Sequence, residues 1–265
     1  MKKPPKKRRW LLPAAAIALL VLFFARGLIF QWIFRNEWPS QTGRDVPVLM
    51  YHAVGEEPWG EEHLFVRPAE LEAQLICLQE QGYETITFPD LAHLEDYEKP
   101  ILLTFDDGYE DNYTEVFPLL RKYQAKATIF IIPGNLGLPH FLTEDQVKEL
   151  SASGLVSIQS HSQTHPQLTQ CGMEQLFSEL KESRDAITGI TGIRPIALSY
   201  PNGLSSPLTR RATKLFYAFG VRIGDECYRT GRNAHAVPRL SVVRGMSTEE
   251  FAALIAAPSP EYDDV

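Results

Sequence analysis

The chain has 265 residues, of which 44% are hydrophobic and 22% are charged, and this composition excludes a disordered or fibrous protein. Its formal net charge is −7, but residues 1–35 contain eight basic side chains and no acidic one. Residues 36–265 therefore carry 18 basic against 33 acidic side chains, a net charge of −15. Such an acidic body is a poor match for nucleic acid phosphates, so we expect no nucleic-acid partner.

A hydrophobic segment with a basic flank opens the chain. Six positive residues lie within residues 2–9. The apolar stretch 10–34 would span roughly 37 Å as a helix, which is enough to cross a bilayer with some tilt. Because the basic flank favours the cytoplasmic side, we expect the N-terminus inside the cell and everything after the stretch outside.

A cleaved signal peptide is the rival interpretation of this segment. It requires small residues before the cleavage site, and the stretch 22–26 has none at the required position. We therefore predict an uncleaved anchor in a single-pass protein of the cell membrane. Its parts are a basic cytoplasmic segment at 1–9, a transmembrane signal anchor at 10–35 and a linker at 36–45.

The body of the chain, residues 46–257, alternates short apolar runs with helical patterns, and an acidic tail follows at 258–265. In the first half of the body we expect, in chain order, a strand at 46–51, a helix at 68–81, a β-rich run at 83–88, a buried strand at 100–105, a helix at 116–123 and a strand at 127–132. In the second half we expect a helix at 143–151, a strand at 155–159, a helix at 173–188, a strand at 196–200, a helix at 208–216, and strands at 218–222 and 238–243. Strands interleaved with helices indicate a parallel α/β architecture, and about seven such units favour a barrel over an open sheet.

Polar side chains follow three of the expected strands. Asp106 and Asp107 follow the run 100–105, His161 and His165 follow the run 155–159, and His52 follows the first strand. In parallel folds these strand ends meet at one edge, where functional groups gather.

Each of these segments also has a structural interpretation. Asp106-Asp107-Gly108 alone would suit a turn, and the two histidines alone could lie on the surface. Adjacent carboxylates at a buried strand end repel each other unless a cation or hydrogen bonds compensate. Two imidazoles and one carboxylate form a metal site with open positions, and the second aspartate can then act as a base.

The motifs resemble those of a known family. The segments TFDDGY at 104–109 and SHSQTHPQL at 160–168 are similar to the first two motifs of the polysaccharide deacetylases, carbohydrate esterase family 4 with the NodB-homology domain. VPVLMYHAVG at 46–55, the region 65–91 and VPRLSV at 237–242 extend the resemblance over nearly the whole body. The sequence is similar in particular to the exported branch of this family, which includes poly-N-acetylglucosamine deacetylases. The resemblance implies a distorted (β/α)7 barrel of the NodB type.

The resemblance also implies roles for individual residues. Asp107, His161 and His165 match the ligands of one divalent transition metal, usually zinc, and Asp106 matches the catalytic base.

The third family motif, usually Arg-Pro-Pro-Tyr-Gly, is altered here to Ser-Tyr-Pro-Asn-Gly at 199–203. Arg239 is the candidate for orienting the base in place of the missing arginine. Asn202 can still donate a backbone N–H to an oxyanion where the family has tyrosine. A late acid histidine is not evident, so His52 is the candidate acid and His235 the next.

These features predict a membrane-anchored, metal-dependent enzyme with an extracytoplasmic catalytic domain. It would remove N-acetyl groups from N-acetylglucosamine units of a glycan polymer, either peptidoglycan or an exopolysaccharide. A catalytically impaired carbohydrate-binding protein of the same fold is the alternative, supported by the altered third motif. A phosphatase of the aspartyl-phosphate type is disfavoured because it needs its two aspartates two residues apart, whereas Asp106 and Asp107 are adjacent.

Overall fold

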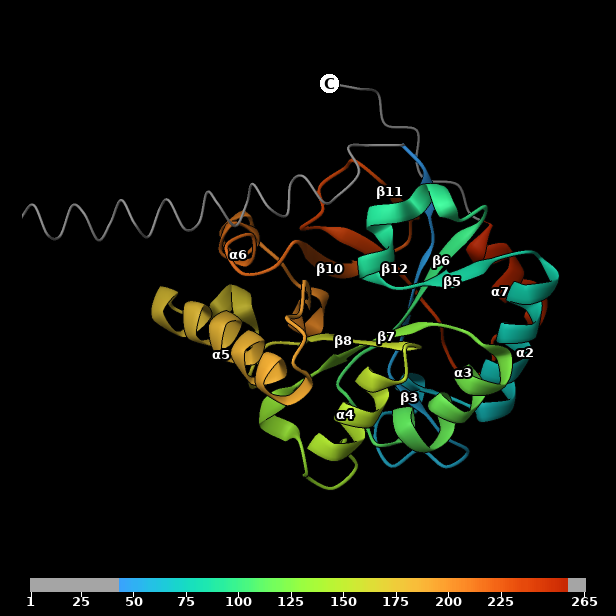
Figure 1. Cartoon of the computed structure of the whole chain (residues 1–265), viewed down its shortest axis with the longest axis horizontal. Coiled ribbons are helices and arrows are strands. Elements are labelled where there is room, and N and C mark those ends of the chain that lie inside the picture. The colour runs from blue at the N-terminus through green and yellow to red at the C-terminus, as the bar shows by residue number, and fades with distance from the viewer. Residues whose placement is uncertain (1–42, 257–265) are drawn as a thin grey trace, which may run out of the picture. The chain divides into compact units, whose positions relative to one another are not determined.

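The computed structural model describes residues 43–256 (Figure 1). The expected anchor at 10–35 and the acidic tail at 258–265 lie outside these residues, as does most of the linker at 36–45. Of the two units into which the chain divides, Met1–Trp38 and Pro39–Val265, the second contains every described residue. Within residues 43–256, no helix is both long and apolar enough to cross a membrane.

Seven parallel strands close into a barrel, which confirms the architecture expected from the sequence. They follow one another around the barrel as β2 (Val48–Tyr51), β12 (Val237–Ser241), β10 (Phe219–Gly224), β9 (Ala197–Ser199), β8 (Val156–Ser160), β7 (Ala127–Ile131) and β6 (Pro100–Phe105). The circle closes because β6 pairs in parallel with β2 as well as with β7.

The barrel is uneven. A single residue pair, Ser160 with Leu198, joins β8 to β9, whereas five pairs join β7 to β8. The short strand β5 (Glu84–Ile86) pairs with the first half of β6, and β7 pairs with its end. The barrel ladder therefore has its fewest residue pairs between β8 and β9, next to the histidine segment.

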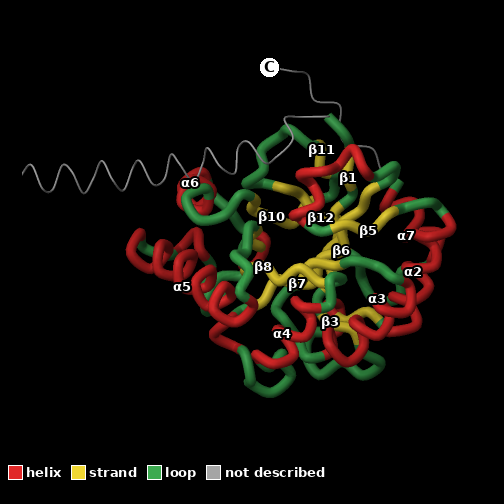
Figure 2. The backbone as a smooth tube through the Cα atoms, viewed as in Figure 1, coloured by secondary structure: helices red, strands yellow, loops and turns green. Residues whose placement is uncertain are grey.

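Helices surround the strands (Figure 2), and this cover explains why all six residues of β6 are buried. They are α2 (Pro68–Glu80), α3 (Phe117–Tyr123), α4 (Glu144–Ala152), α5 (Met173–Thr191), α6 (Pro207–Thr213) and α7 (Thr248–Ile255). Side-chain caps start several of them; Thr143, for example, accepts a hydrogen bond from the Gln146 N–H at the start of α4.

Several elements differ from the sequence-based expectation. The strand expected at 46–51 is divided at Pro47 into β1 (Asp45–Val46), which pairs with β11 (Tyr228–Arg229), and β2, which enters the barrel. Proline lacks the N–H that a continuous ladder would need. The helix expected at 116–123 is preceded by a π-helical turn, Asn112–Val116, and α7 was not expected at all.

Short elements complete the body. The strands β3 (Ala53–Val54) and β4 (Phe65–Val66) pair in parallel beyond the end of β2. Short 3-10 segments occur at Glu62–Leu64, Phe88–Asp96, Pro133–Asn135, Leu168–Gln170 and Pro201–Gly203. Because the barrel strands are all parallel, the residues that follow β2, β6, β8 and β9 meet at one edge of the barrel.

Candidate metal centre and active site

Asp106 and Asp107 leave β6 in different directions. The Asp106 N–H donates to the Tyr51 carbonyl at 3.0 Å, which extends the β6–β2 ladder and keeps Asp106 in the barrel with 2% of its surface exposed. Asp107 has φ of 72° and therefore turns the chain. Gly108 follows with φ of 72°, and a Cβ at this position would lie 2.9 Å from the Ile131 side chain. This tight turn separates the two adjacent carboxylates.

His161 is oriented by a neighbouring strand. Its Nδ1 lies 2.8 Å from the Ser199 carbonyl oxygen, at the end of β9. A carbonyl oxygen can only accept, so Nδ1 carries the proton and the lone pair of neutral His161 is on Nε2. This is how a histidine is prepared to bind a metal through Nε2.

His165 reaches the same place through a compact loop. Its N–H donates to Ser162 Oγ at 3.1 Å, and both residues have positive φ. Burial lowers the pKa of His165, and the neighbouring His161 lowers it further. The pKa shift favours the neutral imidazole, the form that binds a metal.

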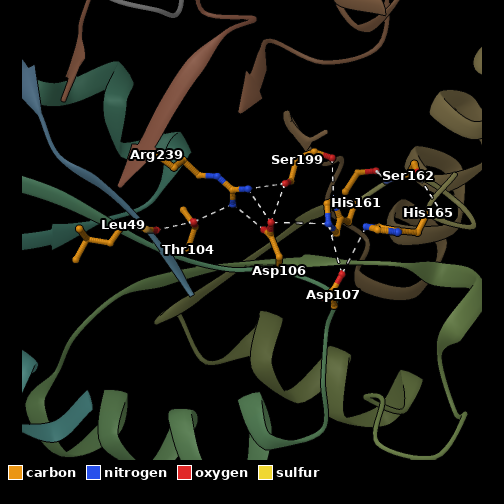
Figure 3. A network of polar contacts seen from close by, with 10 residues as sticks. Leu49, Thr104, Asp106, Asp107, His161, Ser162, His165, Ser199 and Arg239 are labelled. Carbon is orange, nitrogen blue, oxygen red and sulfur yellow. Dashed lines mark hydrogen bonds and ion pairs between the residues drawn. The ribbon is translucent and has the colours of Figure 1, made fainter. Parts of the chain in front are cut away.

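The three residues expected to bind a metal converge (Figure 3). Asp107 Oδ1 lies 3.5 Å from His161 Nε2 and 3.7 Å from His165 Nε2, and all three ligand atoms lie within 4.8 Å of one another. Ligands held about 2.1 Å from one ion at a tetrahedral angle are about 3.4 Å apart. The donor set and its spacing therefore fit a single divalent transition metal.

Arg239 forms the most buried contact of the site. It lies on β12 with 1% of its surface exposed, and its two terminal nitrogens donate to the two oxygens of Asp106 at 2.7 Å each. The same nitrogens also donate to Thr104 Oγ1 at 3.1 Å and Ser199 Oγ at 3.0 Å. Arg239, the candidate for orienting the base, thus binds the Asp106 carboxylate in a bidentate geometry (Figure 3).

Arg239 also sets the ionisation of Asp106. Burial alone would raise the pKa of this carboxyl group, but the charges of Arg239 and His161 and the hydrogen bonds from Arg239 outweigh it. The result is a pKa well below the usual carboxyl range. Asp106 is therefore an ionised acceptor at neutral pH, and the repulsion expected between the adjacent carboxylates is compensated.

His52 lies half-buried at the end of β2. The Asn112 side-chain amide donates to the His52 carbonyl at 3.1 Å, which ties this position to the π-helical turn. Burial lowers the pKa of His52, while the charges of Asp106 and Asp107 oppose that shift. Protonated His52 would be a stronger acid than a free histidine.

His235 precedes β12, at the opposite edge of the barrel, and its Nε2 lies 3.1 Å from the Tyr217 carbonyl oxygen.

Asn202 lies in the turn that follows β9. Its φ is 59°, a conformation that asparagine tolerates better than most residues. Ser199, which opens the same altered motif, is the residue that links it to the site. Its hydroxyl donates to Asp106 Oδ2 at 3.1 Å and its carbonyl holds His161.

Unusual backbone conformations gather at this edge of the barrel. Within residues 43–256, six non-glycine residues have positive φ, and four of them are Asp107, Ser162, His165 and Asn202. A fifth, His140, lies in a loop joined to the Asp107 turn. Such conformations cost free energy and persist where the surrounding structure imposes them, as at functional sites.

Glu179 on α5 holds the loop between the two histidines, and sequence reasoning missed it. Its Oε2 accepts from the Gln163 and Thr164 N–H groups at 2.8 and 2.9 Å, and its Oε1 accepts from Thr164 Oγ1 at 2.6 Å. The only sequence signal is an acidic residue on the inner side of an amphipathic helix, where a buried charge needs partners.

Known proteins resemble this chain in sequence and in structure. The polysaccharide deacetylase family pattern matches residues 93–219. YxkH of Bacillus subtilis, whose name places it among the polysaccharide deacetylases, is 36% identical over 231 residues, covering 84% of this chain and 79% of that protein. The crystal structure of BC0361, a polysaccharide deacetylase from Bacillus cereus, has a TM-score of 0.76 at 32% identity, covering 80% of this chain and 69% of that one.

A shorter match is to poly-β-1,6-N-acetyl-D-glucosamine N-deacetylase of Escherichia coli K12, which is 29% identical over 134 residues. This match covers 43% of the present chain and 20% of the E. coli protein. Barrel, site and relatives together define a deacetylase of the NodB-homology type. The chain belongs to the polysaccharide deacetylase family, as its motifs predict.

The Glu179 contacts generate a first prediction. Glu179→Gln should weaken Zn²⁺ binding about 10- to 100-fold, because an amide nitrogen cannot accept the loop hydrogen bonds that position the two histidines. Isothermal titration with Zn²⁺ measures the change, and Glu182→Gln, an exposed position on the same helix, is the matched control. Equal Zn²⁺ affinity in both variants would show that the loop does not depend on Glu179.

The Arg239–Asp106 pair generates a second prediction. Arg239→Met should lower the free energy of unfolding by about 3–5 kcal/mol at neutral pH, because it leaves a buried carboxylate without its partner. Removal of the exposed partner in Arg121→Met should cost less than about 1 kcal/mol. Denaturant titrations of both variants test these values.

The pH dependence of that loss has a definite sign. In the native protein the pKa of Asp106 is lowered, so its contribution to stability is present above about pH 4 and is lost as the pH falls below that value. In Arg239→Met, burial raises the pKa instead, so the variant loses stability as the pH rises. The deficit should therefore be small near pH 3 and large at pH 7. A deficit independent of pH would contradict a charged Asp106.

Proposed function

We propose that this protein is a metal-dependent hydrolase that removes N-acetyl groups from N-acetylglucosamine units of a cell-surface or extracellular polysaccharide. The observation that carries the proposal is the placement of an ionised, buried carboxylate beside a three-ligand cluster. Asp106 Oδ2 lies 3.7 Å from His161 Nε2, which borders the ligand atoms of Asp107 and His165.

One divalent transition metal, zinc in the first instance, would be held by Asp107, His161 and His165. When bound, such a cation polarises the acetyl carbonyl and lowers the pKa of water toward ~7, which a base of low pKa such as Asp106 requires. The fit rests on two imidazole nitrogens and one carboxylate oxygen, a donor set that these metals prefer.

Asp106 would take the proton from the attacking water. Both of its oxygens accept hydrogen bonds from Arg239, so the carboxylate cannot rotate, and its Oδ2 faces the histidine side of the site. Oδ2 already accepts from Arg239 and from the Ser199 hydroxyl, whereas Oδ1 accepts from Arg239 and keeps a second lone pair for the proton. Arg239 thus supplies the orientation that the family's third motif usually provides.

The remaining steps need a donor for the oxyanion and a proton for the leaving amine. The Asn202 N–H would donate to the oxyanion of the tetrahedral intermediate, a type of contact whose loss costs roughly 3 kcal/mol. His52, in its protonated form, would give its proton to the departing amine. The products are a free amino sugar unit and acetate.

A catalytically impaired carbohydrate-binding protein remains the second candidate. The observation in its favour is the altered motif at 199–203, which lacks both the arginine and the tyrosine of the family pattern. The Arg239 fork on Asp106 argues against this alternative, because it restores the contact that the lost arginine would make.

We also propose that the protein is anchored in the cell membrane by residues 10–35, with its N-terminus inside and residues 46–257 outside. The basic segment at 1–9 supports that orientation. An extracytoplasmic catalytic domain would meet a glycan polymer such as peptidoglycan or an exopolysaccharide.

Acetate release separates the roles of the two aspartates. The protein loaded with Zn²⁺ should release acetate from an N-acetylglucosamine oligomer, and chelation should abolish the activity. Asp107→Ala should lose both metal and turnover, whereas Asp106→Asn should keep the metal and lose the rate. Elemental analysis with an acetate assay measures both. Metal loss in Asp106→Asn with retention in Asp107→Ala would reverse the roles, and wild-type protein without acetate release would favour the sugar-binding alternative.

The acid role of His52 has its own test. His52→Ala should lower kcat by ~10²–10⁴-fold with unchanged metal content, because only the proton donor is removed. The alkaline limb of the pH–rate profile, where His52 loses its proton, should disappear in the variant. His93→Ala, at an exposed position outside the site, is the control. Near-normal turnover in His52→Ala would rule out His52 as the acid.

The orientation in the membrane can be tested on intact cells. Protease added from outside should digest residues 46–257, while the purified full-length product should still begin with residues 1–35. A mature chain that starts near residue 36 would contradict an uncleaved anchor.

A further inference from the structure

We propose that Trp59 and His140 form a subsite that stacks against a pyranose ring of the glycan, next to the sugar unit whose acetyl group is removed. This inference rests on the proposed function, and it adds residues that neither the motifs nor the metal cluster includes.

The two rings form an exposed aromatic stack. Their centroids are 4.3 Å apart with an interplanar angle of 12°, and Phe65 and Tyr109 pack edge-on against Trp59 at 5.3 and 4.8 Å. Even with these contacts, Trp59 is 43% exposed, and His140 is exposed as well. A tryptophan that served only the core would be covered, so the stack presents a rigid apolar surface to solvent.

Two chain segments connect this aromatic stack to the metal cluster. Trp59 lies in the loop between β3 and β4, and β3 starts directly after the candidate acid His52. On the other side, Tyr109 packs against Trp59 and lies two residues after the metal-ligand candidate Asp107 in the chain. Trp59 therefore packs against the residue that follows the Asp107–Gly108 turn.

The position of His140 is tied to the same turn. Its carbonyl accepts from the Glu110 N–H at 2.8 Å, and the Leu142 N–H donates to the Gly108 carbonyl at 3.0 Å. His140 itself has φ of 69°, a costly conformation outside the metal cluster. The strained residue holds its ring flat against Trp59, which suggests that the stack has a use beyond packing.

A pyranose ring is the occupant that this surface fits. The axial C–H bonds on one face of a β-linked glucosamine carry partial positive charge and meet the negative face of an aromatic ring. Four glutamates flank Trp59 in the segment 56–62, so an anionic polymer or an anionic lipid surface would be repelled. An uncharged acetylated sugar avoids that repulsion and leaves its acetamide toward the neighbouring cluster.

Tryptophan fluorescence tests the proposal without requiring turnover. The full-length protein has four tryptophans, Trp10, Trp32, Trp38 and Trp59, so Trp59→Phe removes the signal of one and keeps the other three as an internal reference. Titration with an N-acetylglucosamine tetramer should change the emission of the wild-type protein and of Asp107→Ala, and the change should be absent in Trp59→Phe. An unchanged wild-type emission, or an equal change in Trp59→Phe, would overturn the subsite.

Affinity and chain length give a second readout. Trp59→Ala should weaken binding of the tetramer on the order of tenfold, with a smaller effect on the monomer, because the neighbouring sugar makes the contact. His140→Asn should also weaken tetramer binding, because asparagine tolerates the positive φ of this position but lacks the stacked ring. Ile193→Ala, at an exposed apolar position beyond α5, is the matched control. Equal losses on monomer and tetramer would contradict a neighbouring-sugar subsite.

The two proposals fail separately. Tetramer binding to Trp59 without acetate release would leave the subsite standing and refute the deacetylase. Acetate release with no fluorescence response from Trp59 would support the enzyme and refute the subsite.

Discussion

The buried ion pair between Asp106 and Arg239 is the interaction on which the rest of the site depends. It joins β6 to β12, two strands that are not neighbours in the barrel because β2 lies between them. A buried pair depends on how well its hydrogen bonds are satisfied. The two terminal nitrogens of Arg239 are shared by Asp106, Thr104 and Ser199, while its buried Nε has no hydrogen-bond partner. The pair thus links barrel closure to the ionisation and orientation of one carboxylate.

The metal cluster is built on the same edge by a different means. Asp107 and His165 point inward because their backbones adopt positive φ, and their conformations are held by the tight contact of Gly108 with Ile131 and by the loop contacts of Glu179. Asp106 and His161 directly follow the strands β6 and β8, whereas turns with positive φ supply the other two residues. This division places four polar side chains from two chain segments around one point, next to the buried Asp106–Arg239 pair.

The strand and helix pattern of the body could be predicted where hydrophobic runs were long. The six buried residues of β6 and the apolar spacing along α2 are visible in the sequence, and both elements lie where they were expected. The two-residue strands β3 and β4 could not be predicted, because a pairing that short depends on its partner and has no periodicity of its own. The π-helical turn before α3 was hidden for a related reason, since it depends on packing around Asn112 and His52.

The sequence by itself determined the family and the candidates for the base, the acid and the metal ligands, because these lie at strand ends in short motifs with local spacing. It named Arg239 as the residue to orient the base without showing a contact. Only the tertiary structure decided that Arg239 meets Asp106 across 133 positions, that Glu179 holds the histidine loop, and that Trp59 stacks on His140. The physical reason is that such contacts follow from the closure and register of parallel strands, which bring together segments with no local signal of one another.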